Sequence, residues 1–245
     1  MARRRRLYVP DLPLAGGTVT LPRESVEHVH VLRLACGAEV ELFDAHGRVA
    51  VAALTQIGRD RVECTAEPAQ VASAGGQALT LVVCLPKAAQ LESIVRMATE
   101  LGVATIHLAS SERSVPKLAA DGQKLERLRR IAREACAQSG AARPPVLVGP
   151  SALAACISAA PVTARKLAFW ERASQPLPAA ASGAFAEPEV WAVIGPEGGL
   201  SDAEAAQLEA AGFALTTLGA HILRAETACV VIAALLLDRM RVPRA

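Results

Sequence analysis

Short apolar runs alternate with segments of helical periodicity from residue 79 onward, and this alternation constrains the fold more than any other feature of the chain. In one such segment, apolar residues recur at helical spacing from Leu125 to Ala135. Strands that alternate with helices predict an α/β domain with a mostly parallel sheet and helices on both faces. We expect strands at residues 79–84, 105–109, 166–170, 190–194 and 214–218, and helices at 91–101, 123–138, near 202 and at 228–237.

The first 70 or so residues have a different pattern, with short strand candidates separated by Gly, Asp and Pro. The segment Asp44-Ala45-His46-Gly47 predicts a hairpin turn, and residues 24–32 predict one helix. This spacing suits a small β-barrel. Residues 71–77 (VASAGGQ) are small and predict a linker. We therefore expect two domains, at residues 1–72 and 73–245.

Two polar, glycine-containing loops lie between an apolar run and a helix in the second domain. The first is GPEGG at residues 195–199, followed by the capping-box pattern Ser201 to Glu204. The second covers residues 218–224. Open α/β sheets bind small molecules at such strand ends. Because the glycines lack a Walker lysine and the G-x-G-x-x-G spacing, a nucleotide-like ligand without a triphosphate fits best, and an ordinary tight turn is the alternative.

Arg224 and Glu226 lie just before the last apolar run. In one interpretation Glu226 caps the helix and Arg224 is its ion-pair partner. In the other, Arg224 faces a substrate. The chemistry of the two residues does not decide between these two interpretations.

Composition excludes several classes of protein. Aromatic residues are 3% of the chain, which argues against base-stacking platforms as the main way of binding nucleic acid. The longest apolar run, residues 228–237, is too short to cross a membrane. Six scattered cysteines without a CxxC pair predict no metal site and a reduced, cytoplasmic protein.

Clustered basic residues are candidates for phosphate contacts, although the net charge is only +2 and an excess of arginine also follows from genome composition. Arg4, Arg5 and Arg6 belong to an N-terminal run that either reaches RNA phosphates or forms a tail. His30 and Arg33 are further candidates. His28 and His30 are two residues apart, which is a poor spacing for a metal pair on a helix.

Several collinear motifs resemble the RsmE family of ribosomal RNA methyltransferases in the SPOUT superfamily. The GPEGG and LRxETA motifs together are specific to it, whereas either alone is weak. The matching residues are His30-Val31-Leu32-Arg33, Leu42-Phe43-Asp44, Lys87 with Glu92, Thr99-Glu100-Leu101-Gly102-Val103, Ser111-Glu112-Arg113-Ser114, Gln138-Ser139-Gly140, Ile194-Gly195-Pro196-Glu197-Gly198-Gly199, and Leu218-Gly219 with Ile222-Leu223-Arg224-Ala225-Glu226-Thr227-Ala228.

The resemblance implies an N-terminal PUA-like β-barrel that helps bind RNA, and a SPOUT α/β domain with a deep trefoil knot. Knots are nearly absent from other folds, so no periodicity predicts one. It also implies S-adenosylmethionine as cofactor, a homodimer, and methylation of uridine N3 in 16S rRNA of the small ribosomal subunit, at the family's position 1498. A related methyltransferase acting on tRNA and a non-catalytic RNA-binding protein are the alternatives.

Individual residues have expected roles as well. A cation near the uracil carbonyls would stabilise the uracil anion; Arg224, oriented by Glu226, is the first choice for it, and a group from a dimer partner is the alternative. RNA would contact Arg4, Arg5, Arg6, His30, Arg33, Lys87, Arg113 and Arg143. The cofactor would contact Phe169, Trp170, Glu171, Ile194, Gly195, Pro196, Glu197, Gly198, Gly199, Leu218, Gly219, Ile222, Leu223 and Arg224. The chain departs from the family at Ala141 and His221, where the family usually has basic residues, and Arg143 is the candidate replacement at the first place.

Overall fold

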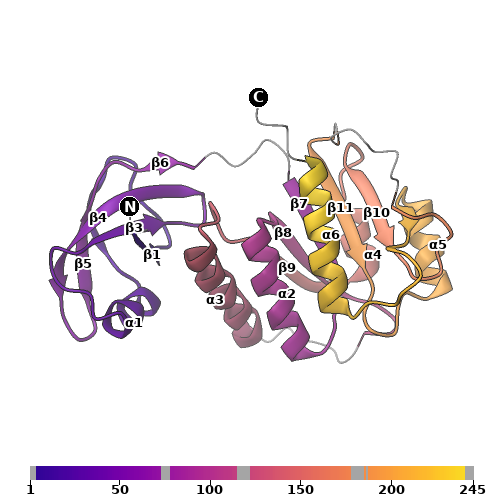
Figure 1. Cartoon of the computed structure of the whole chain (residues 1–245), viewed down its shortest axis with the longest axis horizontal. Helices are drawn as coiled ribbons and strands as arrows, with labels where there is room; N and C mark the ends of the chain where they lie inside the picture. The colour runs from indigo at the N-terminus through magenta and orange to yellow at the C-terminus, as the bar shows by residue number, and fades with distance from the viewer. Residues whose placement is uncertain (1–3, 73–77, 115–121, 178–184, 186, 241–245) are drawn as a thin grey trace. The chain divides into compact units, whose positions relative to one another are not determined.

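A computed structural model describes residues 4–72, 78–114, 122–177, 185 and 187–240 (Figure 1). The chain divides into two compact units. The N-terminal unit comprises Met1–Ala74 and Arg133–Pro144, and the C-terminal unit comprises Gly75–Ala132 and Pro145–Ala245. The predicted boundary at residue 72 did not anticipate that Arg133–Pro144 groups with the N-terminal residues. The division into domains at residue 72 therefore stays a prediction. Residues 73–77 of the predicted linker lie outside the described residues.

The N-terminal unit is built on a six-stranded sheet with the order β1-β3-β4-β5-β2, and β6 pairs with β4. Pairing is antiparallel except between β1 and β3. Alternate residues of β4, among them Ala50, Ala52 and Leu54, face the core because successive side chains of a strand point to opposite sides. The elements are β1 (Arg5–Tyr8), β2 (Gly17–Thr20), α1 (Arg23–Val31), β3 (Glu39–Phe43), β4 (Arg48–Ile57), β5 (Val62–Ala66) and β6 (Gln70–Val71).

The predicted hairpin turn joins β3 to β4 and is organised by the buried carboxylate of Asp44. Its Oδ1 accepts hydrogen bonds from the backbone N–H groups of His46 at 2.8 Å and Arg48 at 2.9 Å. Its Oδ2 accepts one from the backbone N–H of Leu12 at 3.2 Å. Gly47 takes the positive φ of 80° that the turn requires. The hairpin prediction is confirmed.

The C-terminal unit contains a second six-stranded sheet with the order β12-β10-β11-β7-β8-β9, in which every neighbouring pair is parallel. The predicted parallel sheet is thus confirmed. The strands are β7 (Ala78–Cys84), β8 (Thr105–Ser110), β9 (Val146–Ala152), β10 (Arg165–Phe169), β11 (Glu189–Ile194) and β12 (Ala214–Thr216). Strand β9 was not predicted, since Gly149 and Pro150 interrupt its apolar pattern.

Helices cover both faces of this sheet, as the alternation predicts (Figure 1). On one face, Leu81 and Val83 of β7 pack with Ile94 of α2 and Ile232 of α6. On the other face, Val82 of β7 belongs to a cluster that includes residues of α4 and α5. The short helix α4 was not predicted. The helices are α2 (Ala88–Leu101), α3 (Gly122–Ser139), α4 (Leu153–Ser158), α5 (Asp202–Ala210) and α6 (Ala225–Met240), and the part of α3 from Arg133 onward belongs to the N-terminal unit.

The topology sets the place of any ligand site. Because the strands are parallel, the loops after β7, β8, β10, β11 and β12 all leave from one edge of the sheet. The predicted knot stays a prediction. No helix within the described ranges is both long and apolar enough to cross a membrane.

Candidate functional site

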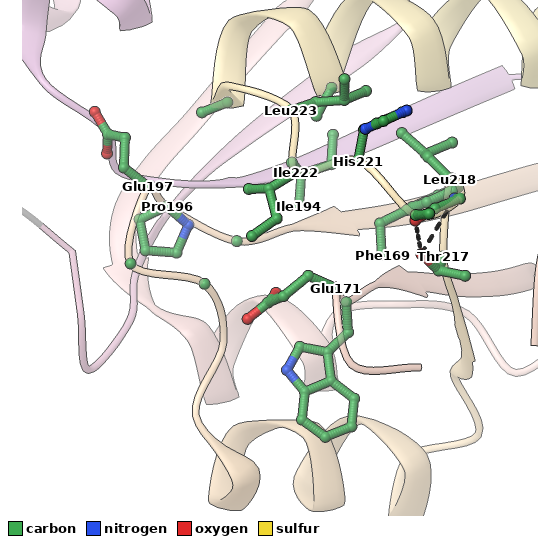
Figure 2. A pocket seen from close by; sticks show the side chains of 18 residues that line it. Phe169, Glu171, Ile194, Pro196, Glu197, Thr217, Leu218, His221, Ile222 and Leu223 are labelled. Atoms are coloured by element: carbon green, nitrogen blue, oxygen red, sulfur yellow. Dashed lines mark hydrogen bonds between the residues drawn. The ribbon is translucent and has the colours of Figure 1, made fainter. Parts of the chain in front are cut away.

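A pocket of about 310 Å³ lies where β10, β11 and β12 end, and 18 residues line it (Figure 2). Its size falls in the range of small-molecule sites. Every residue predicted to bind the cofactor lines it except Arg224. The predicted residues in the lining are Phe169, Trp170, Glu171, Ile194, Gly195, Pro196, Glu197, Gly198, Gly199, Leu218, Gly219, Ile222 and Leu223, and those not predicted are Thr217, Ala220, His221, Ala225 and Ala228.

The first wall of the pocket is the glycine loop, residues 195–199. Gly199 has a positive φ of 70°, and a Cβ built there would collide with the Glu171 carboxylate. A Cβ on Gly195 would come within 3.1 Å of the Leu200 backbone nitrogen. The loop then enters α5 through the predicted capping box, in which Ser201 and Glu204 satisfy each other's backbone N–H groups. Backbone conformation therefore favours glycine at position 199, and close packing against the Leu200 backbone favours it at position 195.

The loop after β8 supports the glycine loop from outside the pocket. Nη1 of Arg113 donates a hydrogen bond to the carbonyl oxygen of Gly198 at 2.9 Å. A Cβ on Gly198 would lie 3.2 Å from the Arg113 Cβ, so the arginine stem covers this glycine. The backbone N–H of Glu112 donates to Glu204 Oε1 at 2.7 Å. Arg113, predicted to contact RNA, thus binds the pocket wall.

The loop after β12 forms the opposite wall. The backbone N–H of Thr217 donates to the Gln175 carbonyl at 2.9 Å. The Thr217 side-chain oxygen bonds to the backbone of Gly219, which has a φ of 121° (Figure 2). Ile222 belongs to the lining although 83% of its surface is exposed. The sequence prediction placed Thr217 inside a strand at residues 214–218, whereas β12 ends at Thr216, and so Thr217 was not among the predicted site residues.

The charges in the lining are negative. Glu171 and Glu197 carry carboxylates, His221 is the other ionisable residue, and the 18 lining residues include no lysine or arginine. Arg172, next to Glu171 in the chain, pairs with Asp202 and stacks on the Trp170 ring. The pocket therefore attracts cations, and polyphosphates fit it poorly.

Arg224 and Glu226 stand at the start of α6, beside the pocket. Arg224 is exposed, and its side chain makes no hydrogen bond or ion pair to any other described residue. The Oε2 atom of Glu226 is buried without a hydrogen-bond partner in the described part of the chain. No hydrogen bond or ion pair joins these two side chains within the described residues. The predicted role of Glu226 in orienting Arg224 is therefore not supported by a direct bond between them.

Lys87 lies near the glycine loop, at the start of α2. Its backbone N–H donates a long hydrogen bond to Glu197 Oε1 at 3.4 Å, and its exposed side chain lies at the same sheet edge as Arg113.

Two buried cysteines lie in the core of the C-terminal unit. Burial raises the pKa of the Cys84 thiol to about 12 and also raises the pKa of the Cys229 thiol. Both thiols therefore stay protonated, and neither is an activated nucleophile.

Arg6 is placed differently from the prediction that it contacts RNA. It is 7% exposed, and its Nε donates to Glu41 at 2.7 Å. Its Nη1 donates to the carbonyls of Cys136 at 2.9 Å and Ala141 at 2.8 Å. Its guanidinium also lies over the Phe43 ring. The strand turns this side chain inward, where it ties β1 to residues 136–141 and is unavailable to a phosphate.

The other predicted RNA contacts of the N-terminal unit lie at its surface. Arg4 pairs with Glu39 at 3.0 Å, and Arg5 is exposed. His30 Nε2 lies 3.1 Å from the Gly58 carbonyl. Arg33 is exposed and follows α1 with a φ of 53°. Arg143 is exposed, and its side chain passes the hairpin glycine Gly47.

Two family models match the chain. An RNA methyltransferase domain covers residues 75–237, and an RNA methyltransferase PUA domain covers residues 21–67. The ribosomal RNA small subunit methyltransferase E of Synechocystis is 32% identical, over 91% of this chain and 74% of the relative. Its counterpart in Bacillus subtilis is 29% identical, over 86% of each chain.

A solved structure has the same fold. The crystal structure of a ribosomal RNA small subunit methyltransferase E from Neisseria gonorrhoeae, bound to S-adenosyl methionine, superposes with a TM-score of 0.86. It is 28% identical and covers 96% of this chain and 98% of its own. The agreement extends over both units.

Proposed function

The chain belongs to the ribosomal RNA small subunit methyltransferase E family, and from this premise we propose that it transfers a methyl group from S-adenosylmethionine to N3 of a uridine in 16S rRNA. The observation that carries the proposal is the pocket between the loops after β10, β11 and β12. It is built from the GPEGG and LRxETA segments that are characteristic of the family.

The residues present fit the cofactor. Ile194, Leu218 and Ile222 offer apolar surface for a planar adenine. The glycine loop lets a ligand approach backbone hydrogen-bonding groups closely. The carboxylates of Glu171 and Glu197 suit a ligand that carries positive charge and hydroxyl donors but no phosphate. When bound, S-adenosylmethionine supplies a methyl group activated by a sulfonium.

Arg224 is our candidate for stabilising the substrate in the reaction. Uracil N3 attacks a methyl group well only after it loses its proton, so negative charge develops on the neighbouring carbonyl oxygens. The Arg224 guanidinium is exposed beside the pocket and has no partner among the described residues. Its donors are therefore free for those oxygens. Glu226 holds a buried acceptor at the same helix start, which we propose takes a hydrogen bond once RNA is bound.

We propose that residues 1–72 form the RNA-binding domain and residues 73–245 the methyltransferase domain. Surface cations suitable for phosphate contacts are Arg5 and Arg33 in the first, with Arg143 beside its hairpin turn. Lys87 leaves the sheet edge near the pocket. These contacts are electrostatic and would position the RNA, while the shape of the pocket region would select the base.

A homodimer is the assembly we propose. Helix α6 is apolar on its buried side and also beyond it: Ala234 is exposed, and Leu235 is 41% exposed. A helix that is apolar around much of its circumference normally has a second partner. Light scattering coupled to size-exclusion chromatography would give twice the 25.5 kDa chain mass for the dimer.

The reaction is tested by mapping the methylated nucleotide. Small ribosomal subunits from a strain that lacks the enzyme are incubated with the protein and labelled S-adenosylmethionine, and the RNA is digested and analysed by mass spectrometry. N3-methyluridine at a single 16S position is the expected product. Methylation of tRNA instead would favour the tRNA alternative. Cofactor binding without any transfer would favour a non-catalytic RNA-binding protein.

A further inference from the structure

Glu171 presents a carboxylate to the pocket that no described residue neutralises. It follows β10, it is exposed, and its side chain forms no hydrogen bond or ion pair with the described part of the chain. Figure 2 shows the side chain directed toward the glycine loop, and a Cβ on Gly199 would collide with its carboxylate. The carboxylate therefore lies directly against the pocket wall.

None of the neighbouring arginines within the described residues forms an ion pair with this carboxylate. The guanidinium of Arg113 is bound to the carbonyls of Gly198 and Leu200. The guanidinium of Arg172 is paired with Asp202. Glu197 adds a second carboxylate at the rim, although its Oε1 is turned toward the Lys87 backbone N–H. Glu171 is therefore the carboxylate of the lining that makes no hydrogen bond or ion pair to a described residue, and its charge is available to a ligand in the pocket.

We propose that Glu171 makes the pocket selective for the positively charged methyl donor over its demethylated product. This inference rests on the proposed function. S-adenosylmethionine and S-adenosylhomocysteine differ by one methyl group and one positive charge. A carboxylate in a partly enclosed pocket attracts the sulfonium and gives nothing comparable to the neutral thioether. The loss of that attraction upon methyl transfer weakens product binding and clears the pocket for the next cofactor.

Calorimetric titration of both ligands tests the proposal without measuring activity. Glu171→Gln removes the charge and keeps the shape of the side chain. We expect its affinity for S-adenosylmethionine to fall about fivefold while that for S-adenosylhomocysteine changes less than about twofold. Glu171→Asp keeps the charge and should retain most of the preference. Glu209→Gln removes an exposed carboxylate on α5 outside the pocket lining, and should leave both affinities unchanged.

Salt provides a second measurement that does not depend on a variant. Raising the ionic strength should weaken binding of the sulfonium more than binding of the thioether in the wild-type protein. The proposed selectivity would be wrong if Glu171→Gln lost the same fraction of its affinity for both ligands. It would also be wrong if salt left the ratio of the two affinities unchanged in the wild-type protein. Wild-type protein that binds neither ligand would overturn the proposed function as well, and so the two failures are distinguishable. A thermal unfolding curve for each variant verifies that it is folded.

Discussion

Arg113 and Gly198 are 85 residues apart in the chain, yet Nη1 of the arginine donates a hydrogen bond to the glycine carbonyl at 2.9 Å. The bond joins the loop after β8 to the loop after β11, and the arginine stem covers the glycine at the same point. A residue predicted to contact RNA thus supports one wall of the pocket.

Arg113→Ala should therefore weaken S-adenosylmethionine binding. A hydrogen bond from a charged donor contributes about 1.5 kcal/mol, so we expect roughly a tenfold loss of affinity by calorimetry. Arg96→Ala, which removes an exposed arginine of α2, is the matched control. If Arg113→Ala binds cofactor normally and loses only affinity for RNA, the supporting role is wrong.

Gly199→Ala should damage the glycine loop for two reasons. Its φ of 70° is unfavourable for alanine, and the added Cβ would collide with the Glu171 carboxylate. Gly212→Ala is the control, because Gly212 has a φ of 86° but nothing within 4 Å of its would-be Cβ. Because the exposed Glu171 side chain can turn away from the added Cβ, we expect Gly199→Ala and Gly212→Ala to lose similar stability, about 1 kcal/mol each, in urea unfolding. Only Gly199→Ala should bind cofactor weakly by calorimetry, since it displaces the carboxylate that lines the pocket, and normal cofactor binding by this variant would contradict the role of the loop.

Arg6→Ala should destabilise the N-terminal unit strongly. The substitution strips the carbonyls of Cys136 and Ala141 of their donor and leaves Glu41 without its partner. Breaking such a buried network costs about 3 kcal/mol. Arg5→Ala, one residue away and exposed, should change the unfolding free energy by less than about 0.5 kcal/mol. Similar unfolding curves for the two variants would refute the structural role of Arg6.

Arg224→Ala should lower the rate of methyl transfer and leave cofactor affinity nearly unchanged, because Arg224 does not line the pocket. Removing one donor to a developing oxyanion typically slows a reaction about 100-fold. Single-turnover methylation of small subunits measures the rate, and calorimetry measures the affinity. Arg224→Lys should recover part of the rate. A full rate in Arg224→Ala, together with lower stability, would mean that Arg224 is only structural.

The buried thiols predict a pH dependence of stability. Burial raises the folded-state pKa of Cys64 and Cys136 to about 11 and that of Cys84 to about 12, against 9.0 for the free thiol. A raised folded pKa means that stability is full below pH 9 and is lost as the pH rises toward 11 and 12. Urea unfolding between pH 8 and 11 should show this decline, and replacing Cys84 with Ala should reduce it. At pH 8 iodoacetamide should label exposed Cys36 first.

Local pattern was enough for most of the C-terminal unit. The alternation of apolar runs and helical segments predicted the parallel sheet and its two helical layers, because burial of both faces requires those runs. It failed at β9, where Gly149 and Pro150 resemble a loop. Pairing with β8 supplies the hydrogen bonds that hold this segment in the sheet, and such pairing is invisible to local propensity.

The site divides in the same way. The amino-acid sequence by itself indicated two of the pocket loops, residues 195–199 and 218–224, because polar, glycine-containing segments after parallel strands lie at one sheet edge. The third wall, Phe169 to Glu171, has no such signal and was expected only from the family resemblance. Only the tertiary structure decided what single residues do: Arg5 and Arg6 are chemically identical neighbours, yet one is exposed and the other binds carbonyls 130 and 135 residues away. It likewise directs Arg113 to the Gly198 carbonyl and gives Arg224 no partner among the described residues. The physical reason is that hydrogen bonds of a long cationic side chain depend on which acceptors folding brings within about 3 Å, and sequence spacing does not encode that distance.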